Sequence, residues 1–193
     1  PGLHAGFSLD QDGEGVFLFD KTSNGGALLD SVSFGLQLPN LALGRLQNRG
    51  EFVLTQPTFG TNNVAQPLAD PRRLKINEWL ASEFVASATD FVELHNPEPL
   101  PVALGGLHFT DNPIGEPARH ILAPLSFIDA QSYRVFKADG DPQQGFDHLN
   151  FKLAAEQGLV ALLLPNLEAI DLILYGPQRT DVSQGRLPDG GNS

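Results

Sequence analysis

The chain of 193 residues contains no cysteine and no methionine, and only 12 of its residues are Lys or Arg. The absence of cysteine excludes disulfides and thiolate metal sites. Against the few basic residues stand 23 Asp and Glu, which give a formal net charge of −11. Binding to a nucleic-acid backbone requires a basic face, so no nucleic-acid partner is expected. An anionic membrane surface is disfavoured for the same reason.

Long apolar runs are also missing. The longest, residues 158–165, has the length of a strand, whereas a membrane-spanning helix needs about 20 apolar residues. No membrane insertion is therefore expected. The chain begins with Pro1 and carries no charged segment followed by an apolar run. These features predict a processed or truncated piece of a longer protein.

Glycine and proline, by contrast, are frequent and lie between short apolar runs. The chain has 20 Gly and 15 Pro, a distribution typical of an all-β sandwich or barrel. Strands are predicted at 16–19, 27–34, 74–80, 90–94, 102–109, 132–136, 159–164 and 169–175. Asn24-Gly25 predicts a hairpin turn within 21–26, because both residues tolerate positive φ. Residues 121–128, interrupted by Pro124, predict a loop with an edge strand, and 80–88 is weakly helix-like.

One sequence unit occurs twice, and its first copy is incomplete. The matching segments are 4–9 (HAGFSL) with 148–153 (HLNFKL), 29–35 (LDSVSFG) with 170–176 (IDLILYG), and 44–46 (GRL) with 185–187 (GRL). Their order is kept, and the register drifts by three residues, as a shortened hairpin turn would produce. A repeated unit usually indicates an array of modules. Between the copies, Pro67 and Pro71 predict a linker at 64–73, because proline cannot sustain a hydrogen-bonded ladder.

From residue 74 onward, six short motifs occur in the order that is found in bacterial lamin tail domains, and the chain resembles that family over about 74–191. The motifs are 76–78 (INE), 90–97 (DFVELHNP), 104–111 (LGGLHFTD), 148–153 (HLNFKL), 170–171 (ID) and 183–190 (SQGRLPDG). Residues 1–63 resemble the C-terminal half of a preceding copy and end in 57–63 (PTFGTNN), which is similar to the closing segment of the family.

The resemblance implies an immunoglobulin-like β-sandwich, present as one near-complete copy at 74–193 and one partial copy at 1–63. It also implies a non-catalytic structural or interaction role on a secreted or cell-surface bacterial protein. The alternative is an accessory domain of a larger secreted hydrolase or nuclease whose catalytic part lies elsewhere. The family brings no catalytic residue, cofactor or metal ligand with it.

The cut first copy leads to a hypothesis about partners. Half a sandwich exposes an apolar face and an unpaired strand edge, which are not stable alone. Either an upstream piece of the same polypeptide completes it, or another chain does so by strand addition. In the second case further copies of the chain could complement each other head to tail.

The residues 10–15 (DQDGEG) are the best metal candidate. Asp10, Asp12 and Glu14 stand at relative positions 1, 3 and 5, with glycine at position 6, as at the start of a calcium loop. Position 12 is Lys21 and the bidentate glutamate is missing. An acidic β-turn is therefore the favoured interpretation, with calcium binding as the alternative.

Catalysis finds little support in the sequence. The five histidines form no close pair of the zinc-binding type; they are His4, His95, His108, His120 and His148. His4 and His148 are repeat equivalents, which favours a structural role at a strand start. Glu78, Glu93 and Asp90 could supply paired carboxylates for hydrolysis, but the two glutamates alternate with apolar residues, where polar side chains normally face water.

Two charged residues recur at matching positions of both copies. Asp30 and Asp171 are equivalent, as are Arg45 and Arg186. A carboxylate–guanidinium pair in each copy is the economical interpretation, because arginine offers a rigid fork of donors. Nearby glycines recur too, and Gly35, Gly44, Gly176 and Gly185 are expected in turns that need positive φ.

Overall fold

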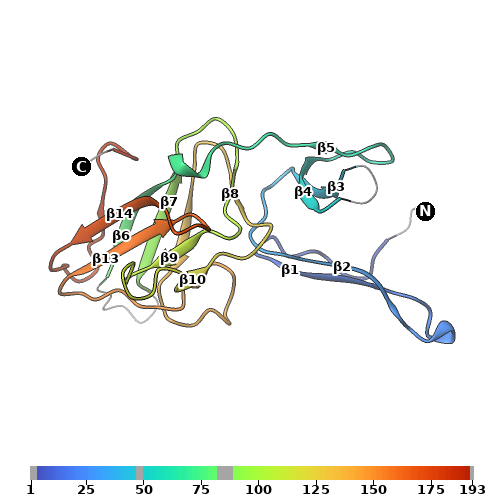
Figure 1. The fold of residues 1–193 in the computed structure, drawn as a ribbon, viewed down its shortest axis with the longest axis horizontal. Coiled ribbons are helices and arrows are strands. Elements are labelled where there is room, and N and C mark those ends of the chain that lie inside the picture. The colour runs from blue at the N-terminus through green and yellow to red at the C-terminus, as the bar shows by residue number, and fades with distance from the viewer. Residues whose placement is uncertain (1–3, 47–49, 82–88, 192–193) are drawn as a thin grey trace.

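The computed structural model describes residues 4–46, 50–81 and 89–191, and in these residues the fold is all-β with several antiparallel sheets. Two single turns of 3-10 helix, η1 (Thr22–Asn24) and η2 (Pro71–Arg73), are the exceptions. The arrangement is compatible with the expected sandwich. Figure 1 shows the later strands gathered in one body and the first hairpin extending away from it.

Two four-stranded sheets and one short pair make up the C-terminal part. The first sheet has the order β12 (Ser132–Lys137), β7 (Phe91–Asn96), β6 (Lys75–Leu80), β15 (Gln184–Gly185). The second has the order β10 (His120–Ile121), β9 (His108–Thr110), β13 (Gly158–Leu163), β14 (Ala169–Tyr175). The pair is β8 (Val102–Ala103) with β11 (Phe127–Ile128). The predicted strands at 74–80, 90–94, 132–136, 159–164 and 169–175 are thus confirmed to within about two residues at each end.

A single apolar core joins the two large sheets. Ile76 and Leu94 come from the first sheet, Phe109 and Leu162 from the second, and all four side chains are fully buried in one cluster. The strict alternation expected for 74–80 is broken by a shift of register between Ile76 and Glu78. A bulge of this kind turns two successive residues inward, and it leaves Asn77 buried beside Ile76.

Two predicted stretches are divided by turns. The strand expected at 102–109 consists of β8 and β9 in different sheets, because Gly105-Gly106 lies between them and Gly106 has φ 83°. Residues 121–128 form a loop that carries β10 at one end and β11 at the other, and Leu125 has φ 53°. The expected edge strand is therefore present twice. The weakly helix-like stretch 80–88 lies largely outside the described residues, and Leu80 is the last residue of β6.

The N-terminal part contains a hairpin and a three-stranded sheet. The hairpin joins β1 (Glu14–Phe19) to β2 (Leu28–Phe34). Its turn has Gly25 at φ 98° and Gly26 at φ 66°, which agrees with the predicted turn within 21–26. The sheet has the order β3 (Ala42–Arg45), β4 (Phe52–Gln56), β5 (Val64–Ala65). The stretch 64–73, expected as a linker, includes β5 and η2.

The segment after β2 connects the two parts. The backbone N–H of Phe127 donates to Leu36 O at 2.9 Å, and the N–H of Gly35 donates to Pro124 O at 3.1 Å. Leu36 belongs to the main core, while Leu38 packs with Phe127 in a second, smaller cluster. The N-terminal part is therefore held against β11, and its hairpin projects beyond that contact (Figure 1).

Candidate interaction site

Two hairpins far apart in the sequence have the same register. In β1–β2, Glu14 lies opposite Phe34 and Leu18 opposite Asp30, with a bulge immediately after Leu18. In β13–β14, Gly158 lies opposite Tyr175 and Leu162 opposite Asp171, with a bulge immediately after Leu162. One constant difference in residue number relates β1 to β13, and another relates β2 to β14. The two differences are three residues apart, as the sequence matches require.

The inner faces of these hairpins differ in what covers them. In β13–β14 the side chains of Val160, Leu162, Ile173 and Tyr175 are all buried in the main core. Their counterparts in β1–β2 are Val16, Leu18, Val32 and Phe34. Of these, only Phe34 is buried, while Val16 and Val32 are half-buried and Leu18 is 59 % exposed. The hairpin β1–β2 thus presents an apolar face that its counterpart packs away.

The outer edges of the two hairpins differ as well. β13 has a second neighbour, since Ala161 lies opposite Thr110 and Leu163 opposite His108 in β9. The corresponding edge of β1, at Phe17 and Phe19, has no strand beside it in the described part of the chain. Phe17 and Phe19 are both more than half exposed. An open edge next to apolar side chains is a surface that another strand can extend.

The carboxylate–guanidinium pairs predicted from the repeat are present in both parts. Arg45 Nη1 and Nη2 donate to Asp30 Oδ2 and Oδ1 at 2.6 and 2.8 Å. Arg186 Nη2 donates to Asp171 Oδ1 and Oδ2, both at 3.1 Å. In each case the partners are separated by 15 residues. The pairing prediction is therefore confirmed at both sites.

The first strand of the C-terminal part covers one of these pairs. The backbone N–H of Ile76 in β6 donates to Asp171 Oδ2 at 2.8 Å, and Arg186 Nε donates to Ile76 O at 2.8 Å. As a result the side chains of Arg186 and Asp171 are 7 % and 9 % exposed. Those of Arg45 and Asp30 are 35 % and 44 % exposed. The hydrogen bond from Arg45 holds the pKa of Asp30 below its ordinary value.

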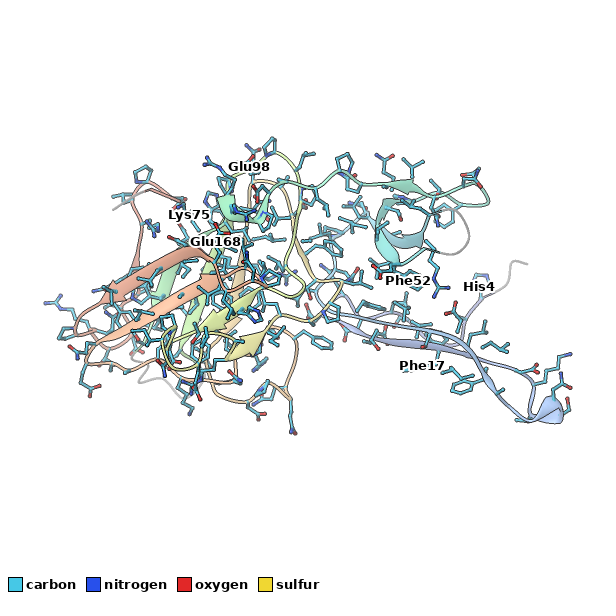
Figure 2. All side chains as sticks on the ribbon, viewed as in Figure 1. His4, Phe17, Phe52, Lys75, Glu98 and Glu168 are labelled. Atoms are coloured by element: carbon cyan, nitrogen blue, oxygen red, sulfur yellow. The ribbon has the colours of Figure 1, made fainter. Side chains whose placement is uncertain are left out.

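An apolar groove lies between the open hairpin and the sheet β3–β4–β5. Its volume is about 480 Å³, and it is lined by Val16 and Val32 from the hairpin and by Leu43 and Phe52 from the sheet. The Phe52 ring packs on the Arg45 guanidinium at 4.2 Å. Figure 2 shows Phe52 on the side of β4 that faces the hairpin, with Phe17 on the other side of the hairpin. Sequence reasoning missed Phe52, although the apolar run that starts there is a strand signal.

The repeat-equivalent histidines have different surroundings. His148 is buried, with Asp139 Oδ2 at 2.6 Å from its Nδ1 and Lys137 Nζ at 3.0 Å from its Nε2. Both ring nitrogens therefore have partners, as a structural histidine requires. His4 is exposed, so the structural role expected for the pair is seen only at His148. The residues that hold His148 precede it in the chain, in the part of the unit that the first copy lacks.

The carboxylates of the acidic turn at 10–15 accept hydrogen bonds from the backbone N–H groups of the same turn. The N–H of Asp10 donates to Glu14 Oε1 at 2.6 Å, and the N–H of Asp12 donates to Asp10 Oδ1 at 2.9 Å. Gly13 has φ 112°. This geometry is the acidic β-turn favoured from the sequence. Within the described ranges no group of three or more His, Asp or Glu side chains is arranged so that it could hold a metal ion.

The structure brings two of the three candidate carboxylates side by side. Glu78 and Glu93 are directly opposite each other on β6 and β7, and Asp90 is a buried residue just before β7. Asn77 Nδ2 donates to Glu93 Oε1 at 3.1 Å. Both glutamates are half-buried. Glu93 stands at an outward position of the alternating strand β7, as expected, and Glu78 follows the bulge of β6.

The prediction for the repeated glycines is wrong. None of Gly35, Gly44, Gly176 and Gly185 has a positive φ. Three of them are sites of close approach instead. A Cβ on Gly35 would lie 2.0 Å from Ser126 Oγ, one on Gly44 2.7 Å from Asn63 Nδ2, and one on Gly185 3.0 Å from Asn77 O. Their lack of a side chain is needed for packing and not for backbone conformation.

Comparison of the chain with protein-family models, with curated proteins and with solved structures gave no match. Among the described residues no helix has the length and apolar character needed to cross a membrane. The interpretation of the site therefore rests on the internal comparison between the two hairpins, their ion pairs and their glycines.

Proposed function

We propose that this protein is a non-catalytic structural or interaction module that assembles through sheet edges or strand exchange between copies of the chain. The observation that carries the proposal is the hairpin β1–β2, which has the register and ion pair of β13–β14 but lacks its cover. Apolar side chains exposed next to an open edge are what a second chain can bury by adding a strand.

The proposed architecture is a tandem of two immunoglobulin-like units of the lamin tail type. Residues 74–193 are the near-complete unit, 1–63 the C-terminal half of another, and 64–73 the connection. The equal separation of 15 residues in Asp30–Arg45 and Asp171–Arg186 supports the tandem. The family resemblance supports the immunoglobulin-like topology and a place on a secreted or cell-surface bacterial protein.

A binding role is favoured over catalysis by the chemistry of the site. The groove beside the hairpin is lined mainly by apolar side chains, with Asp10 as the charged residue of its lining. The neighbouring Asp30 and Arg45 form an ion pair and neutralise each other. Such a surface suits the burial of another chain. The formal charge of −11 supports a protein partner and not a nucleic acid.

The test is hydrogen–deuterium exchange of the full chain at low and at high protein concentration. We expect the amides of β1 to exchange fast at low concentration and to become protected as the concentration rises. The amides of β13, which lie between two strands, serve as the internal control and stay protected throughout. Exchange of β1 that is independent of concentration, whether fast or slow, would overturn the proposal.

A further inference from the structure

We propose that the Asp30–Arg45 pair is a recognition site for an extended strand of a partner polypeptide that has the pattern of Leu74 to Leu80. This inference rests on the proposed function and specifies the segment that covers the inner face of the hairpin and its ion pair, as β6 does in the C-terminal part. The strand is recognised through its backbone by the ion pair and through its apolar side chains by the adjacent groove.

The C-terminal part contains the template for this recognition. There the strand β6 presents one residue, Ile76, whose N–H donates to the Asp171 carboxylate and whose C=O accepts from Arg186 Nε. The ion pair thus acts as a clamp that binds both polar groups of a single backbone unit. Hydrogen bonds to charged groups are stronger than those between neutral groups, so the clamp fixes the register of the strand.

The N-terminal pair offers the same two contacts without an occupant. Arg45 uses Nη1 and Nη2 for Asp30, and its Nε has no hydrogen-bond partner within the described ranges. The Phe52 ring packs on the face of the guanidinium, which leaves the in-plane Nε–H accessible. Asp30 Oδ1 already accepts the N–H of Ser31 at 2.8 Å, so a further N–H can be accepted by Oδ2, the same oxygen that Ile76 uses on Asp171. Both side chains are more than a third exposed. The carboxylate of Asp30 can thus accept from the N–H of an arriving strand, and the guanidinium of Arg45 can donate to its C=O.

The groove next to the pair suits the side chains of such a strand. In the C-terminal part, Ile76 is fully buried in the core that also contains Val160 and Ile173. The counterparts of those two residues, Val16 and Val32, line the groove of about 480 Å³. An apolar side chain at the position of Ile76 would therefore be buried between them.

A glycine next to the pair provides room for the incoming backbone. Gly185 lies opposite Glu78, and a Cβ on it would be 3.0 Å from Asn77 O. Gly44 stands at the matching position, one residue before Arg45. Its open side is now taken by the side chain of Asn63, which donates to Arg45 O at 2.8 Å. Asn63 is exposed, so its amide can move aside for a strand.

The probe is a synthetic peptide with the sequence of residues 74–81, LKINEWLA, titrated into the full chain and followed by NMR of the arginine Nε–H signals. We expect saturable binding that shifts the Arg45 signal and protects it from exchange with water. The Arg186 signal, which is already bonded to Ile76 O, stays unchanged and is the internal control. A peptide with proline in place of Ile76 lacks the N–H that Asp30 would accept.

We compare two further affinities with that of the native peptide for the native chain: the proline peptide with the native chain, and the native peptide with the Asp30→Ala chain. Each should be at least about tenfold weaker, because each lacks a hydrogen bond to a charged group. Equal affinity in either comparison, or no binding of the native peptide to the native chain, would overturn the inference. If the peptide fails but β1 becomes protected at high concentration, the proposed function stands and the recognition site is refuted. If both fail, both proposals fall.

Discussion

Removal of the guanidinium at Arg186 tests the role assigned to the covered ion pair. Arg186 donates through Nε to Ile76 O and through Nη2 to Asp171. Alanine at this position leaves a carboxylate that is 9 % exposed, with Lys75 Nζ at 3.9 Å from Asp171 Oδ1 as its remaining positive partner. Breaking a buried pair by removing one partner costs about 3–5 kcal/mol. For a chain of this size that corresponds to a fall in melting temperature of about 6–20 °C.

The matched control is Arg45→Ala. It removes the equivalent ion pair at the same sequence spacing, but from a pair over which no strand lies within the described residues. Exposed pairs contribute little to stability, so the urea midpoint should stay within error of the wild type at low protein concentration. The assay is urea unfolding followed by the fluorescence of Trp79, the only tryptophan, whose side chain is buried in the C-terminal core. Equal losses in the two variants, or no loss in Arg186→Ala, would refute the reasoning.

Two further predictions concern packing and titration. Burial raises the pKa of Tyr175 to about 12 from its ordinary 10.0. Because the tyrosine of the unfolded chain ionises first, the free energy of unfolding keeps its full value below pH 10 and falls as the pH rises towards 12. Titration of absorbance at 295 nm should show this late ionisation, and Tyr175→Phe should leave only the ionisation of Tyr133, whose pKa is raised by its hydrogen bond to Asp189. An unchanged late phase in Tyr175→Phe, or ionisation of both tyrosines near pH 10, would contradict the burial. Gly35→Ala should cost about 1–3 kcal/mol by overpacking, because its Cβ would lie 2.0 Å from Ser126 Oγ. Gly176→Ala, at the repeat-equivalent position with no atom within 4 Å of the added Cβ, should leave the melting temperature unchanged. Similar changes in melting temperature for the two variants would show that the side chain of Ser126 moves away from position 35 at no cost.

The sequence predicted the strands best where the apolar pattern was strong and uninterrupted. Residues 169–175 form β14 with the bounds expected, and the hairpin turn lies within 21–26 as expected, although its positive φ values are at Gly25 and Gly26 and not at Asn24. The Asp–Arg pairs were also predictable, because both partners recur at the same offset in the two copies. These successes share a cause: each depends on local pattern or on a repeated spacing.

The features that escaped prediction depend on contacts between distant segments. The bulge at Ile76–Glu78 changes which residues of β6 face the core, and alternation alone does not reveal it. Gly35 and Gly185 avoid clashes with residues about 90 and 110 positions away, so their role could not be read from a turn signal. The Asp30–Arg45 pair is more exposed than Asp171–Arg186 because, in the described part of the chain, no strand lies over it as β6 lies over the second pair. Only the three-dimensional arrangement shows this difference.

The solution mass of the chain, measured by light scattering over a range of concentrations, tests the central claim most directly. The account predicts a mass that rises above the 20.8 kDa monomer with concentration. Val16→Asp places a charge in the groove and should hold the chain at the monomer mass, whereas Ser33→Asp, on an exposed position of the same hairpin, should assemble like the wild type. A monodisperse monomer at every concentration would contradict assembly through the open hairpin.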